Sequence, residues 1–272
     1  MAHVIINADD FGISDGVCKS IIELLEAGAI TSTSIMCAAD GAVERISSWN
    51  ARSLLGVAGV HLQLTSGVPI SPASEVRTLV DEGTGRFIDP RDGPLPDLDQ
   101  VECEWRRQIE VAMNALGGVP SHLDSHHGMH RIPELFEVYA RLAMELGIPI
   151  RSAKGEIAKR MHSLGIRGTV ALVRDWTGKS LGPESLPRML NQVIKAQPEE
   201  DVVEIISHPG YSDDYLSSIS SLALARENDH RGLLELHRVG WPQNEGHILV
   251  SFRYLSNTPQ DGGRREWQLP TP

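Results

Sequence analysis

The chain is organised around one stretch, His122-Leu123-Asp124-Ser125-His126-His127-Gly128-Met129-His130, which holds four histidines and an aspartate within nine residues. As an extended strand, this stretch places His122, Asp124 and His126 on one side. In a helical register, His126 instead stacks over His130. Either arrangement gathers side chains that bind metal ions, and a solvated loop rich in histidine is the alternative interpretation. The neighbouring segments must decide between the two.

Segments with strand character alternate with helical segments on both sides of this stretch. The histidine stretch is one expected strand, and the others are residues 4–8, 33–38, 57–65, 148–152, 202–206 and 248–252. Repeated strand and helix without internal repeats predict a mainly parallel sheet with outer helices. About seven such units fit an α/β fold, a distorted or incomplete (β/α) TIM-like barrel. A doubly wound open sheet is the alternative.

Capping residues mark the ends of the first helices. Ser14 suits the start of a helix that ends at Gly28. Asp40 can cap a short helix that has Val43 and Ile46 on its buried side.

Later helices carry similar signals. Asp99 and Glu102 suit the two ends of a capping box for a helix that runs to Leu116. Further helices are expected at residues 133–147, 183–196 and 220–237, with a short helix and then a loop between 153 and 182.

Residues 1–257 are expected to form a single catalytic barrel domain. Residues 66–99 interrupt the alternation, because they are rich in glycine, proline and aspartate. A connection of this length is usually a lid or binding loop, and an irregular surface excursion is the alternative. Residues 258–272 are predicted to be a disordered tail.

Composition narrows the class of protein. With 41% hydrophobic residues over 272 positions, the chain can bury a core, yet no apolar run is long enough to cross a bilayer. A formal charge of −11 argues against nucleic acid or an anionic membrane as the main partner. Three scattered cysteines and the lack of a signal-peptide pattern indicate a cytoplasmic location.

Carboxylates and imidazoles follow several of the expected strands. The residues at these strand ends are Asp9, Asp10, His61, His126 and His208. Both candidate folds place active sites at the carboxyl ends of strands, so these side chains are expected to meet. Asp10, His61 and His126 offer one oxygen and two nitrogen ligands. This set suits zinc, manganese, cobalt or nickel, and tolerates magnesium less well.

A metal held in this way lowers the pKa of its water and polarises a substrate carbonyl. Asp9 is placed to take the proton of that water, and His208 can protonate a leaving group. Asp124 is a natural partner to orient a ligating imidazole. Each residue also has a structural interpretation: the paired aspartates as a helix cap, His61 as a hydrogen-bonded core residue and His208 as part of a turn.

Three short motifs carry less weight. Asp10-Phe11-Gly12 spells the kinase D-F-G, but no glycine-rich nucleotide loop or H-R-D segment accompanies it. Gly12-Ile13-Ser14-Asp15-Gly16 matches G-x-S-x-G and makes Ser14 the nucleophile of an alternative serine esterase. It follows the first strand, however, and Ser14 is explained as a helix cap. No H-E-x-x-H occurs, which removes the common zinc protease.

Four blocks of sequence, spread over most of the chain, carry these residues. They are Asn7-Ala8-Asp9-Asp10-Phe11-Gly12, Gly59-Val60-His61-Leu62, His122-Leu123-Asp124-Ser125-His126-His127 and Ser207-His208-Pro209-Gly210. Together they resemble the YdjC-like carbohydrate deacetylases, a family that includes chitooligosaccharide deacetylase. The resemblance implies a distorted (β/α) barrel, one divalent metal ion often assigned as magnesium or zinc, and removal of acetyl from an N-acetylated amino sugar.

The resemblance also implies roles by position. It places metal ligands at Asp10, His61 and His126 and the catalytic base at Asp9. The acid role of His208 is carried partly from the wider polysaccharide deacetylase group.

Other residues in or near these blocks are expected to surround the metal ligands. Some relatives have histidine where this chain has Gly128, which leaves the ligands intact and alters local substrate contacts. The residues expected to orient ligands or contact substrate are Asp124, His127, His130 and Tyr211.

The expected function is a metal-dependent hydrolase that removes acetyl groups from short chitooligosaccharides such as diacetylchitobiose. Alternatives are a metal-dependent hydrolase of another amide or ester, a serine esterase using Ser14, and a sugar-binding protein without turnover. The base Asp9 speaks against the last. Trp176, Trp241 and Tyr211 can stack on sugar rings or pack in the core. The expected partner is a small carbohydrate, and a homodimer is a possible assembly.

Overall fold

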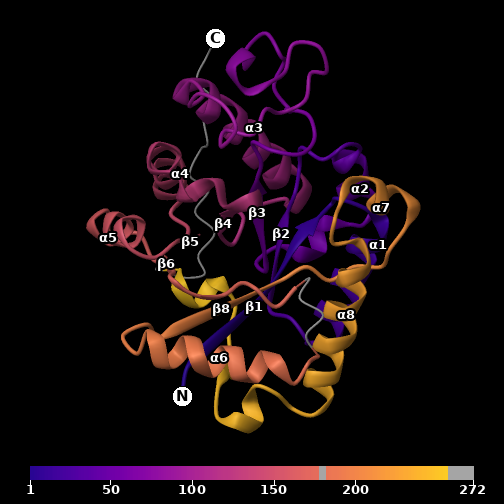
Figure 1. The fold of residues 1–272 in the computed structure, drawn as a ribbon, viewed down its shortest axis with the longest axis vertical. Coiled ribbons are helices and arrows are strands. Elements are labelled where there is room, and N and C mark those ends of the chain that lie inside the picture. The colour runs from indigo at the N-terminus through magenta and orange to yellow at the C-terminus, as the bar shows by residue number, and fades with distance from the viewer. Residues whose placement is uncertain (178–181, 257–272) are drawn as a thin grey trace.

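Parallel strands form the centre of the molecule, and helices lie outside them (Figure 1). The computed structural model describes residues 1–177 and 182–256. Within them the hydrogen-bonded order is β6-β5-β4-β3-β2-β1-β8-β7, and β9 also pairs with β1. The strands are β1 (His3–Phe11), β2 (Ser32–Ile35), β3 (Ala58–Leu62), β4 (Leu123–Ser125), β5 (Ile150–Arg151), β6 (Gly168–Thr169), β7 (Ala171–Val173), β8 (Val202–Ser207) and β9 (Ile248–Leu249). Neighbouring strands run parallel, which confirms the predicted distorted (β/α) barrel.

A single residue joins the two ends of this sheet. β6 lies at one end of the order and pairs with β5, whereas β7 lies at the other end and pairs with β8. Only Val170 separates β6 from β7, so the run 168–173 borders both ends and nearly closes the barrel. The prediction of a short helix and then loop is right for α5 (Glu156–Ser163) and wrong for these strands. Strands of two or three residues are too short to show a periodic pattern.

Most of the predicted helices are present, with bounds close to those expected. They are α1 (Asp15–Ala27), α2 (Ala42–Ser48), α3 (Leu98–Leu116), α4 (Pro133–Leu146), α6 (Ser185–Ala196) and α8 (Ala223–Arg238). Ser14 caps α1 by accepting a hydrogen bond from the backbone N–H of Val17, as predicted. Gly28 ends the same helix in the left-handed region, with φ of 76°, where glycine carries no steric penalty.

Two predicted caps are wrong. α3 begins after Asp97, whose side chain accepts from the backbone N–H groups of Asp99 and Gln100, so the cap lies two residues before the expected one. α2 follows Gly41 without a side-chain cap, and only Ile46 of its two expected core residues is buried.

The last part of the chain is also more broken than the pattern predicted. The helix expected at 220–237 is present as α8 (Ala223–Arg238), and a short helix that was not predicted, α7 (Asp214–Ile219), precedes it. The expected final strand 248–252 is a strand for two residues, and a short 3₁₀ helix, Phe252–Leu255, follows.

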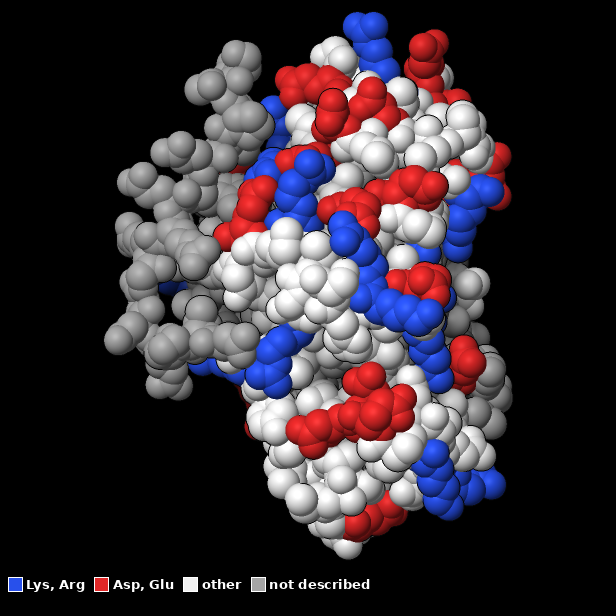
Figure 2. All heavy atoms as spheres, turned by 90° about the vertical axis from the view of Figure 1, so that its left-hand side faces the viewer, with Lys and Arg blue, Asp and Glu red and all other residues white. Residues whose placement is uncertain are grey.

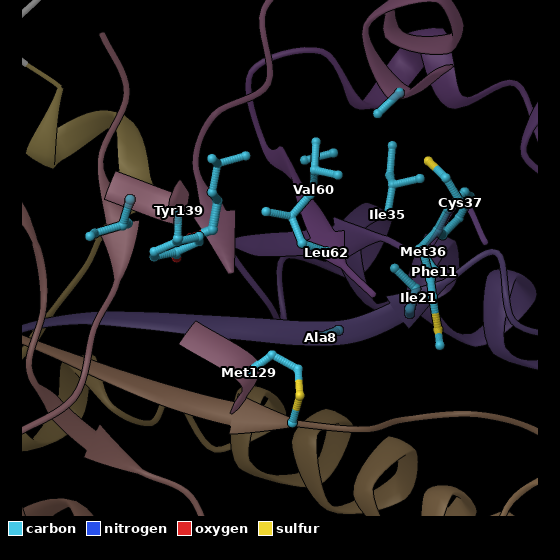
Figure 3. Close-up of a cluster of buried hydrophobic side chains, with 14 of the residues drawn as sticks. Ala8, Phe11, Ile21, Ile35, Met36, Cys37, Val60, Leu62, Met129 and Tyr139 are labelled. Carbon is cyan, nitrogen blue, oxygen red and sulfur yellow. The ribbon is translucent and has the colours of Figure 1, made fainter. Parts of the chain in front are cut away.

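Most of the strands are buried on both faces. All five residues of β3, His61 among them, are buried. Helices cover parallel strands from outside, so the second face looks into the barrel and not into water. Figure 3 shows Val60 and Leu62 of β3 near Ile35 of β2, in the apolar core that also includes Phe11 of β1.

The segment 66–99 is irregular but attached to the barrel. It contains a short 3₁₀ helix, Arg77–Leu79, and an isolated antiparallel bridge between Val80 and Phe87. Glu104 of α3 is fully buried, and its carboxylate accepts from the backbone N–H groups of Ile70 and Ser71, each at 2.9 Å. These bonds fix the start of the segment beside α3.

The described surface carries charges of both signs. On the face in Figure 2, Lys and Arg side chains lie among Asp and Glu side chains, and neither sign dominates. Within residues 1–177 and 182–256, no helix is long and apolar enough to cross a membrane. The predicted disordered tail, 258–272, lies outside the described residues.

Candidate active site

Most of the predicted site residues meet in one cavity of about 1030 Å³ at the carboxyl ends of the strands. Those that line it are Asp9, Asp10, His61, His126, His127, His130 and His208. Asp124 lies beneath them and is fully buried. The strand ends therefore converge as the barrel prediction required.

Three candidate ligand atoms form a nearly equilateral triangle. Oδ1 of Asp10 lies 3.4 Å from Nε2 of His61 and 3.4 Å from Nδ1 of His126, and the two nitrogen atoms are 3.3 Å apart. A tetrahedral ion with bonds of roughly 2.1 Å separates its ligand atoms by about 3.4 Å. Asp10 Oδ1 is also buried without a hydrogen-bond partner in the described part of the chain. The triangle fits a small cation.

The ring of His61 is oriented for this task. Its Nδ1–H donates to Oδ1 of Asp124 at 2.8 Å, which directs Nε2 to Asp10 and His126. Burial lowers the pKa of His61, but the carboxylates of Asp124 and Asp9 overcome this and raise it to about 9. The centre of the barrel therefore attracts positive charge.

The buried carboxylates and guanidinium groups around the triangle carry a net charge of −2. Four carboxylates and two guanidinium groups pair here, and their formal sum is −2; they are Asp9, Asp10, Asp124, Glu204, Arg151 and Arg226. When His61 is neutral, as an imidazole that binds a metal must be, a divalent cation balances this sum, because buried charges need compensation.

Arg151 of β5 connects three of these carboxylates. Its Nη1 and Nη2 each donate to one oxygen of Asp9 at 2.8 Å, and it also pairs with Asp124 at 3.0 Å and Glu204 at 2.6 Å. Burial raises the pKa of Asp9, but the charges of Arg151 and His61 lower it below the ordinary 3.8. Asp9 is therefore ionised at neutral pH. The sequence analysis missed Arg151, although an arginine at the end of an expected apolar strand was a usable signal.

Arg226 of α8 holds the other aspartate. Its Nη2 donates to Oδ2 of Asp10 at 2.6 Å, so Oδ1 of the same carboxylate is left for the triangle. Burial raises the pKa of Asp10, but the charge of Arg226 and the nearby imidazole of His126 bring it well below 3.8. The backbone of Asp10 has a φ of 73°, which is rare outside glycine and typical of functional sites. No sequence signal marked Arg226.

A second group of residues that could bind a metal includes two carboxylates that pair with Arg151. Asp9, His61 and Asp124 also lie close enough to hold an ion. Both of these carboxylates already pair with the guanidinium of Arg151. The set with Asp10 and His126 is therefore the better candidate.

His208 lies across the cavity from the triangle. Its Nε2 is 3.9 Å from Oδ2 of Asp9, and its side chain is 22% exposed. Burial lowers the pKa of His208, and the carboxylates of Asp9 and Asp10 offset part of this effect. The imidazole can therefore exchange a proton close to the carboxylate of Asp9.

His127 and His130 of the central stretch are neutral at ordinary pH. Nδ1 of His127 lies 2.9 Å from Oγ1 of Thr65, and its ring stacks on His126 with centroids 3.9 Å apart. Burial and the neighbouring His126 lower the pKa of His127 to about 4. Nδ1 of His130 lies 2.7 Å from Oγ of Ser125, and burial lowers its pKa to about 3. The helical alternative, with His126 over His130, is wrong because left-handed residues kink the turn after β4.

The aromatic residues considered for sugar stacking lie away from the cavity lining. Trp176 and Trp241 are buried in the core. The hydroxyl of Tyr211 donates to Glu23 at 2.5 Å and lies 3.0 Å from Nε2 of His230. Core packing accounts for both tryptophans.

Strands that bring an acidic oxygen and two imidazole nitrogens together define a barrel with a candidate metal centre. Sequence comparison identifies the family within this class: the family model "YdjC-like protein" matches residues 3–240. The chain belongs to this family, which confirms the resemblance seen in its sequence blocks.

Named relatives align over nearly the whole chain. A carbohydrate deacetylase of Clostridium beijerinckii is 34% identical over 92% of this chain and 99% of its own length. A chitooligosaccharide deacetylase of Proteus mirabilis is 29% identical over 79% of this chain and 85% of its own. The crystal structure of a proposed cellobiose-phosphate cleavage protein from Enterococcus faecalis V583 superposes with a TM-score of 0.82 at 29% identity, covering 94% of this chain and 99% of that one.

Proposed function

We propose that this chain is a metal-dependent carbohydrate N-deacetylase that releases acetate from short chitooligosaccharides such as diacetylchitobiose. The triangle of Asp10 Oδ1, His61 Nε2 and His126 Nδ1 carries the proposal, because it lies beside a carboxylate base and an imidazole acid in one cavity. The named relatives support the deacetylase reaction.

The ligand set supports particular metals. One carboxylate and two imidazoles suit zinc, and also manganese, cobalt or nickel. Magnesium is often assigned to the family that the sequence resembles. It prefers oxygen ligands and octahedral geometry, so it fits this set less well. A bound ion of this kind polarises the acetamide carbonyl and acidifies a water molecule.

Asp9 and His208 divide the proton transfers. Asp9 is ionised, because Arg151 and His61 lower the pKa of its carboxyl group, and it accepts the proton of the attacking water. The water oxygen bonds to the carbonyl carbon, and the bond from that carbon to nitrogen then breaks. His208 gives its proton to the departing amine nitrogen, so that acetate and a free amino sugar leave.

The size of the cavity supports a substrate longer than one sugar. Its volume of about 1030 Å³ is at the upper end of ordinary ligand pockets. A second cavity of about 540 Å³ shares Arg131, Leu172, Arg174 and Asp175 with it and extends the groove. Arginines of this rim also suit a phosphorylated sugar, so neutral and phosphorylated substrates belong in the same assay.

Acetate release from N-acetylglucosamine, diacetylchitobiose and their 6-phosphates tests the function. We expect activity that a chelator abolishes and that zinc, manganese or cobalt restores. Activity that survives complete removal of metal would contradict the mechanism. A metal-loaded protein that is inactive on all four sugars favours the alternative, a metal-dependent hydrolase of another amide or ester.

A further inference from the structure

We propose that Thr177 is the positioning residue of His208, and that it fixes which ring nitrogen of the imidazole carries the proton. Asp229 of α8 stands behind Thr177 as the final acceptor. This inference rests on the proposed function only in assigning the catalytic use of His208, since the hydrogen-bond chain itself is a feature of the fold.

Three hydrogen-bond contacts connect His208, Thr177 and Asp229 in a ring. Nδ1 of His208 lies 3.1 Å from Oγ1 of Thr177, whose hydroxyl donates to Oδ2 of Asp229. The same oxygen of Asp229 accepts the backbone N–H of His208 at 2.9 Å. Both the ring and the backbone of His208 are thus held by one carboxylate, once directly and once through Thr177.

Donor and acceptor counting decides the proton position. The Thr177 hydroxyl has a single hydrogen, and the ionised carboxylate of Asp229 can only accept. Because that hydrogen goes to Asp229, the threonine oxygen can only accept from His208, which requires a hydrogen on Nδ1. Nε2 of His208 is then the atom that gains and loses the proton, and it is the one that faces Asp9.

The charge state of Asp229 agrees with this assignment. Burial raises the pKa of Asp229 to about 6, and the hydrogen bonds from Thr177 and from the backbone of His208 limit the rise. The group is therefore mainly a carboxylate at pH 7 to 8. It is 3% exposed, so water does not compete strongly for its oxygen atoms.

Packing holds Thr177 against α8. The preceding residue, Trp176, is 3% exposed, and its ring lies where a Cβ on Gly232 would come within 3.0 Å. A larger residue at 232 would press on the indole of the residue next to Thr177. Three elements, the end of β7, the end of β8 and α8, thus meet at one hydroxyl group.

The tautomer of His208 is directly measurable. We would record long-range proton–nitrogen spectra of the ¹⁵N-labelled protein at pH 8, with His208→Gln to assign the ring signals. The wild-type spectrum should show hydrogen on Nδ1 and a bare Nε2. Thr177→Val, which has the same shape without the hydroxyl, should lose this preference, and Thr177→Ser should keep it.

Turnover provides the second measurement. Thr177→Val should lower kcat by about ten-fold or more with little change in KM, and Thr177→Ser should restore most of it. Hydrogen on Nε2 in the wild type, or an unchanged tautomer in Thr177→Val, overturns the proposal. The wild-type spectrum decides alone if the valine variant does not fold. A protein that shows the expected tautomer but releases no acetate contradicts the proposed function and leaves the role of Thr177 standing.

Discussion

Replacing Arg151 with methionine tests whether one guanidinium compensates the buried carboxylates. Arg151 is 3% exposed and pairs with Asp9, Asp124 and Glu204. Methionine keeps much of the volume and removes the charge. Breaking a buried ion pair from one side costs about 3–5 kcal/mol. In a domain of this size, each kcal/mol lowers Tm by roughly 2–4 °C, so we expect a fall of about 10 °C.

The loss should depend on pH in a defined direction. Arg151 helps to hold the folded-state pKa values of Asp9 and Asp124 below 3.8, so these ion pairs stabilise the protein above about pH 4 and stop doing so as pH falls. Without Arg151, burial raises both pKa values, and the folded variant loses stability as pH rises. The difference in free energy of unfolding between wild type and Arg151→Met should therefore be largest near pH 7 and shrink towards pH 4.

Denaturant unfolding of the metal-free protein at pH 4, 5.5 and 7 measures this difference. Arg160→Met is the matched control, because Arg160 forms an exposed pair with Glu137. Exposed pairs contribute about 0–1 kcal/mol, so the control should stay near wild type. A variant at position 151 that matches this control at pH 7, or whose deficit is the same at all three pH values, would refute the reasoning.

Three further predictions concern the ligand set, the base and the thiols. His126→Ala should lose bound metal and activity together, as measured by elemental analysis and acetate release; an active, metal-free variant speaks against the ligand role. Asp9→Asn should keep its metal and slow turnover by about 10²-fold or more, the usual scale for loss of a general base; near wild-type kcat would dismiss Asp9. Burial raises the pKa of Cys18 and Cys37 to about 12, so iodoacetamide at pH 8 should modify the half-buried Cys103 alone in the native protein, which peptide mass mapping checks.

The sequence predicted the barrel and the residues that its strand ends carry, because strand direction and the edge where active sites form follow from the alternation of elements. It did not predict the arginines that pair with the aspartates. Arg226 lies 216 residues from Asp10, and nothing in an amphipathic helix shows which of its arginines turns inward. Thr177 follows the short strands that the pattern also missed. Contacts between distant elements depend on how the barrel closes, which local periodicity does not encode.

The central position of β1 has a consequence for how the chain is made. β1 lies between β2 and β8, and Ser207 of β8 donates a hydrogen bond to Asn7 of β1 across 200 residues of sequence. A ribosome that adds roughly 5–20 residues per second needs about 10–40 s to reach β8 after releasing β1. During that interval an apolar strand keeps one open edge, which other chains can extend. Nascent chains that end before β8 therefore require protection from aggregation, and the barrel acquires its native stability only after β8 has been made.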